Sequence, residues 1–87
     1  MKHLDRIRNL DCLICEHMGM DQKGLHSEAH HLESIRDRFS DYAAIPLCVE
    51  HHRGSTGVHG LSRRSFFDRY KLSDVDLLAR TIKALFK

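Results

Sequence analysis

The chain has 87 residues but no tryptophan, one proline and only three cysteines. Besides these it has just two tyrosines and four phenylalanines, so the hydrophobic core must be small. An odd number of cysteines fits a disulfide framework poorly, and Asp5, Arg6 and Arg8 interrupt any apolar signal segment at the start. No apolar run approaches the roughly 20 residues that a bilayer requires. We therefore expect one cytoplasmic domain without a membrane span.

The net charge says little about the binding partner of the chain, whereas its histidine content is informative. Fourteen Lys and Arg against twelve Asp and Glu leave a net charge of +2, which is too weak to indicate a nucleic-acid partner by itself. Eight histidines are present, and five of them lie between residues 30 and 59. A core alone seldom stabilises a chain of less than roughly 70 to 80 residues, and this one is little longer. Bound metal is the expected additional source of stability.

Periodicity and turn residues predict an α+β fold with short elements. In chain order we expect a helix at 2–10, a loop from 16 through Gly24, a strand at 26–32, a loop or irregular helical turn at 33–42, an edge strand at 43–48, a short helix from Cys48 that the glycines at 54, 57 and 60 end, and two C-terminal helices within 62–86.

The two C-terminal helices have recognisable caps. Ser62 is expected to start a helix that reaches about Leu72, with Phe66, Phe67 and Tyr70 on one face, as core residues rather than base-stacking residues. Ser73 and Asp76 have the spacing of a capping box. The residues expected to form the buried stripe of the last helix are Val75, Leu78, Ile82 and Leu85.

Two closely spaced ligand pairs predict a structural zinc site. Cys12 and Cys15 form one pair, and Cys48 and His51 form the other, so that every cysteine is used. Four N and S ligands in two such pairs are typical of a tetrahedral zinc site. Three unrelated buried cysteines are the alternative interpretation, but it leaves the shared spacing unexplained.

The remaining histidines suggest hydrolytic chemistry. His30 and His31 are adjacent, so on a strand they point to opposite sides and should differ in role. A neutral imidazole can bind a divalent cation, and a free imidazole can take a proton from water near neutral pH. Hydrolysis of a phosphodiester needs both functions. The alternative is a set of ordinary core histidines, while His26 is expected to face solvent.

The sequence contains the segments EAHHL at 28–32, DYAAIPLCVEHHRG at 41–54 and GVHGL at 57–61, followed by the Phe-x-x-Tyr helix. Together these segments resemble the HNH endonucleases, and more narrowly the small phage and prophage nucleases of the recombination enhancement function (Ref) and YbcO group. The resemblance covers roughly residues 12 to 80. It implies a treble-clef-like ββα-metal domain, which in this chain would be stabilised by the structural zinc. The metal core would lie at 12–60 and the C-terminal helices at 62–86.

The resemblance also implies roles for individual residues. It makes His31 the general base, and His30, His52 and His59 the ligands of a catalytic divalent cation, Mg²⁺ or Mn²⁺, which Zn²⁺ or Ni²⁺ could replace. The family normally has Asn at the middle position of its motif to orient the base. This sequence has Ala43 there, so the orienting role is assigned to Asp41.

DNA is the expected substrate, and a recombinase filament is a further candidate partner. Arg53, Arg63 and Arg64 are candidate phosphate contacts, because cations along the backbone dominate the binding of a polyanion. A solvated helix face is the alternative for them. The rival function for the whole chain is a zinc module that binds DNA or protein without chemistry. The sequence does not determine the oligomeric state.

Overall fold

The computed structural model of the chain describes residues 2–22, 26–33, 35 and 40–86. Its elements are, in order, α1 (His3–Arg8), α2 (Leu13–His17), β1 (Glu28–His31), a 3-10 turn η1 (Ser40–Ala43), β2 (Ala44–Leu47), α3 (Val49–Arg53), α4 (Arg63–Tyr70) and α5 (Asp74–Leu85). The predicted small α+β fold is confirmed, as are the short N-terminal helix and the two C-terminal helices. None of the helices in the described ranges combines the length and the apolar character that a membrane span needs.

The sheet consists of β1 and β2 in antiparallel pairing, with His30 opposite Ile45 and Ala29 opposite Pro46. Pro46 has no N–H to donate, and it is tolerated because each strand of a two-stranded sheet has one open edge. The expected edge strand at 43–48 is therefore confirmed at 44–47. His30 is buried and His31 is exposed, as the alternation of side chains along a strand predicts.

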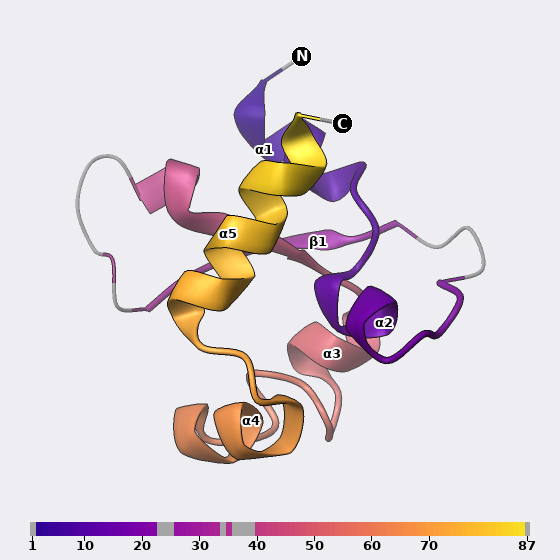
Figure 1. The fold of residues 1–87 in the computed structure, drawn as a ribbon, viewed down its shortest axis with the longest axis vertical. Coiled ribbons are helices and arrows are strands. Elements are labelled where there is room, and N and C mark those ends of the chain that lie inside the picture. The colour runs from indigo at the N-terminus through magenta and orange to yellow at the C-terminus, as the bar shows by residue number, and fades with distance from the viewer. Residues whose placement is uncertain (1, 23–25, 34, 36–39, 87) are drawn as a thin grey trace.

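The longest helix, α5, crosses in front of the sheet, and α1 lies beside its C-terminal end, so both chain ends are close together (Figure 1). A hydrogen bond from Arg6 to the carbonyl of Leu85 joins these ends at 3.4 Å. The core lies between the sheet and the surrounding helices. Its buried members include Leu13, Ile45, Leu47, Phe66, Tyr70, Leu72 and Leu77, together with all three cysteines.

The predicted buried stripe of α5 is wrong in half of its residues. Leu77 and Thr81 face the core, whereas Val75 and Ile82 are 77% and 47% exposed. The Thr81 hydroxyl donates to the carbonyl of Leu77 at 2.9 Å, so its polar group is satisfied inside the core. Leu78 and Leu85 are only partly buried. The predicted stripe omitted Leu77 as well as Thr81, so the spacing of apolar residues alone did not identify the buried face of α5.

Three further differences concern α2 and α4. A loop was expected from residue 16, but Leu13–His17 form a short helix, in which the N–H of Cys15 donates to the Cys12 sulfur. Helix α4 begins as predicted after Ser62, but it ends at Tyr70 because Lys71 adopts a left-handed conformation with φ of 59°. Phe67 is 44% exposed, and so does not belong to the core face with Phe66 and Tyr70. The expectations for 23–25, 34 and 36–39 lie outside the described residues.

Candidate functional site

Cys12, Cys15, Cys48 and His51 converge on one point in the interior, with their ligand atoms within 4.8 Å of one another. Cys12 precedes α2 and Cys15 lies within it, while Cys48 precedes α3 and His51 lies within that helix. Each pair therefore sits at the start of a short helix. The chain between the pairs forms the sheet and brings the two helices together.

The distances within this cluster match a tetrahedral metal site. The sulfurs of Cys15 and Cys48 are 3.7 Å apart, and His51 Nδ1 lies 3.6, 3.5 and 3.3 Å from the sulfurs of Cys12, Cys15 and Cys48. A tetrahedral zinc ion with Zn–S near 2.3 Å and Zn–N near 2.0 Å requires about 3.8 Å between sulfurs and about 3.5 Å between sulfur and nitrogen. The cluster can therefore hold a metal ion such as zinc.

Burial favours the uncharged form of these ligands. Burial raises the pKa of the Cys12 thiol, and burial together with the nearby Cys12 raises the pKa of Cys15 to about 12. Burial lowers the pKa of His51, which favours the neutral imidazole. Several thiolates in one buried place repel each other unless a cation compensates them. A bound metal would supply that charge.

A second cluster brings together His30, His52 and His59, whose ligand atoms also lie within 4.8 Å of one another. The Nε2 atoms of His52 and His59 are 3.1 Å apart, and the ring of His30 is 5.1 Å from each of the other two rings. Three imidazoles are one typical protein donor set of a catalytic metal site. The structure thus assembles the three histidines that the sequence analysis grouped as cation ligands.

Helix α3 serves both clusters because neighbouring residues on a helix point about 100° apart. His51 turns towards the cysteines, and His52 turns towards His30. The glycine loop after α3 then folds back, and the N–H of His59 donates to the carbonyl of His52 at 3.0 Å. A Cβ on Gly57 would lie 2.5 Å from the carbonyl oxygen of Glu50, so this tight return requires glycine.

His30 is electrostatically suited to bind a cation. It is only 5% exposed, and burial together with the neighbouring His52 and His59 lowers its pKa to about 4. Its imidazole is therefore neutral at neutral pH, which is the form that can act as a ligand.

His31, the next residue on β1, forms a separate pair with Asp41. Its Nε2 lies 2.8 Å from the Asp41 carboxylate, which comes from the 3-10 turn η1. Both side chains are largely exposed, at 44% and 63%. With Nε2–H donating to Asp41, Nδ1 carries the free lone pair. Asp41 therefore contacts the side chain that the sequence analysis assigned it to orient.

Glu28 is a site residue that the sequence analysis did not single out. Its carboxylate accepts hydrogen bonds from His52 Nδ1 at 2.8 Å and from Arg53 at 3.0 and 2.6 Å. The hydrogen bond from His52 is the main cause that lowers the pKa of Glu28, and Arg53 adds to it. With Nδ1–H held by Glu28, His52 presents Nε2 to the cluster. The strand period of two could have revealed it, because Glu28 and His30 share one face of β1.

The three arginines predicted to contact phosphate lie in two different places. Arg53 is bound by Glu28, whereas Arg63 and Arg64 lie at the start of α4 beside a cavity. Arg63 is 3.4 Å from Asp74, and Arg64 is 3.9 Å from Asp68. Arg53 therefore supports His52 through a shared carboxylate, in addition to any role in binding DNA.

Comparison with protein-family models, with curated proteins and with solved structures found no match to this chain. The resemblance to the HNH endonucleases therefore stays a prediction, based on the motif residues in the sequence.

Proposed function

We propose that the chain is a metal-dependent endonuclease of the HNH type that hydrolyses phosphodiester bonds of DNA. The observation that carries this proposal is that His30, one of the three clustered imidazoles, is followed on β1 by His31, which pairs with Asp41. The four-ligand cluster is proposed to hold structural zinc, and β1, β2 and α3 are proposed to form the ββα-metal unit. Phage origin and a link to recombination belong to the same proposal.

The residues of the chain divide the chemistry between them. Asp41 accepts the Nε2–H of His31 and so orients the ring, and His31 Nδ1 takes a proton from the attacking water. His30, His52 and His59 would hold the divalent cation, which when bound offsets the negative charge that develops on the phosphate and the leaving oxygen. Glu28 fixes the tautomer of His52. The resemblance implies products with a 5′ phosphate and a 3′ hydroxyl.

The first test is cleavage of supercoiled plasmid and of single-stranded circular DNA by the zinc-loaded protein, with Mg²⁺, with Mn²⁺ or with neither. His31→Ala should reduce cleavage at least 100-fold, because a general base contributes about 10² to 10⁴ to the rate. His26→Ala is the matched control, since His26 is exposed and lies outside both clusters. Full activity of His31→Ala would remove His31 from the role of base.

Metal content separates the nuclease from the rival, a zinc module without chemistry. Elemental analysis and cation titration should give one tightly bound zinc and one exchangeable site per chain for the nuclease. His59→Ala should lose the exchangeable site and keep the zinc. A single site that is unaffected by His59→Ala, together with no cleavage, would favour the binding module.

A further inference from the structure

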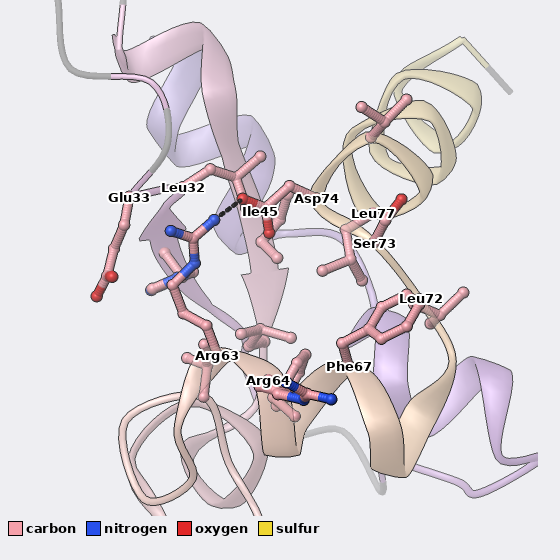
Figure 2. Close-up of a pocket in the computed structure, with 15 residues that line it drawn as sticks. Leu32, Glu33, Ile45, Arg63, Arg64, Phe67, Leu72, Ser73, Asp74 and Leu77 are labelled. Carbon is pink, nitrogen blue, oxygen red and sulfur yellow. Dashed lines mark hydrogen bonds and ion pairs between the residues drawn. The ribbon is translucent and has the colours of Figure 1, made fainter.

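A cavity of about 530 Å³ lies between the sheet and helices α4 and α5. Figure 2 shows Leu32 and Ile45 on one side of it, and Leu72 and Leu77 on the other. Pockets that take small organic ligands have volumes of about 300 to 1,000 Å³ and mostly apolar walls with a few polar groups. This cavity has both properties.

His30 connects the cavity to the histidine cluster. The same buried side chain lines the cavity and lies in edge contact with His52 and His59. A phosphate held at the cluster would therefore have its neighbouring nucleoside next to the cavity. No other member of that cluster lines it among the described residues.

The edge of the cavity combines an aromatic ring with two cations. Phe67 lines the cavity although it is 44% exposed, and Arg63 and Arg64 lie on the same helix (Figure 2). The ion pairs of these arginines with Asp74 and Asp68 are long and solvent-exposed, and such pairs contribute little energy. Both guanidinium groups can therefore exchange a carboxylate for a phosphate. An aromatic face beside cations is the usual combination that binds single-stranded nucleic acid.

We propose that the cavity takes one unpaired base of a single DNA strand, with Phe67 as stacking partner and the adjacent phosphate at the histidine cluster. This inference rests on the proposed function and extends it to the form of the substrate. A base in a duplex must first be unstacked and unpaired, which costs a few kcal/mol, whereas a base in a single strand is already accessible. The site therefore prefers single strands, flaps and displaced strands to intact duplex.

Binding without cleavage gives the first test. The zinc-loaded protein, with no added divalent cation, is titrated against fluorescently labelled oligothymidylate and against a hairpin duplex, and anisotropy is measured. Phe67→Ala should weaken binding of the single strand about tenfold and leave binding of the duplex unchanged. Phe86→Ala is the matched control, because Phe86 is 83% exposed and lines a different groove near the chain ends. Circular dichroism checks that both variants are folded.

The inference is wrong if Phe67→Ala binds the single strand as tightly as Phe86→Ala does, or if the unchanged protein prefers duplex. A second arm uses cleavage with Mn²⁺ of an end-labelled strand that carries one abasic nucleotide beside a mapped cut. The abasic site should reduce that cut about tenfold in the unchanged protein, and should have no further effect in Phe67→Ala, where the stacking partner is already lost. Equal reduction in both proteins would also overturn it.

These arms distinguish the two proposals. In one outcome, Phe67→Ala selectively loses single-strand binding and the unchanged protein cleaves no DNA. This outcome would support the cavity as a base-binding site and contradict the nuclease proposal. In the other outcome, cleavage requires His31 but is unaffected by Phe67→Ala and by the abasic site. This outcome would support the nuclease proposal and contradict base binding in the cavity.

Discussion

At the scale of the residue, Glu28 lies outside the group of three histidines but bonds one of them, His52. Its carboxylate accepts hydrogen bonds from both His52 and Arg53, and the Glu28 side chain is 31% exposed. Carboxylates in this position fix the ring and increase the basicity of the nitrogen that faces the metal. The charge of Glu28, and not only its shape, should therefore matter.

We predict that Glu28→Gln weakens binding of a divalent cation at the histidine cluster about tenfold or more, because Gln keeps the shape but removes the charge. Calorimetric titration of the zinc-loaded protein with Mn²⁺ or Ni²⁺ measures this. Glu50→Gln is the matched control, because the Glu50 carboxylate bonds Thr56 and not a cluster histidine. Zinc content should stay the same in both variants. Equal cation affinity of the two variants would argue against a positioning role for Glu28.

At the scale of the element, the start of α5 supports both the core and the cavity. Ser73 accepts the N–H of Asp76, and Asp76 accepts the N–H of Ser73, which completes the capping box predicted from the sequence. Ser73 and Asp74 also line the cavity, so the cap fixes one of its walls. The hydrogen bonds with Ser73 lower the pKa of Asp76.

Ser73→Ala should lower the free energy of unfolding by about 1 kcal/mol, the usual effect of removing an N-cap. Urea unfolding at constant zinc concentration, followed by circular dichroism, measures the change. Ser55→Ala, at an exposed position in the glycine loop, should stay within about 0.5 kcal/mol of the unchanged protein. A Ser73→Ala protein as stable as Ser55→Ala would mean that packing of Leu77 and Thr81 alone determines where α5 begins.

At the scale of the whole molecule, the four-ligand cluster is part of the core. Cys12, Cys15 and Cys48 pack among its leucines and isoleucines, and the cluster joins α2 to α3. The binding free energy of a structural metal is also folding free energy when the site does not exist in the unfolded chain. His52 follows His51 on α3, so loss of a metal ion bound by the four-ligand cluster should disorganise the second cluster as well.

Removal of zinc by a chelator should therefore unfold the protein, with loss of the far-ultraviolet helical signal and its return when zinc is added back. Chelator already saturated with metal is the control for non-specific effects. His59→Ala separates the two sites, because it should lose the second cation and keep both the zinc and the helical signal. An unchanged spectrum after complete metal removal, checked by elemental analysis, would contradict the structural role of the cluster.

Local chemistry let the sequence predict most of the elements and the grouping of the four Cys and His ligands. The spacing of Cys12 and Cys15 and of Cys48 and His51 was enough to group four ligands, because each pair lies within one turn of chain. Ser62 and Ser73 marked the helix starts because a cap acts within three residues. The grouping of His30, His52 and His59 came from the family resemblance, and the structure brings those side chains together.

Only the tertiary structure determined how these parts face each other. The roles of Glu28 and Arg53, the exposure of Phe67 and the cavity beside His30 all depend on contacts between segments far apart in the chain. The buried face of α5 was mispredicted for the same reason. Thr81 is a polar residue, and it is buried because other segments of the chain pack against it. Spacing and caps are local properties, whereas shape and burial arise only when distant segments pack together.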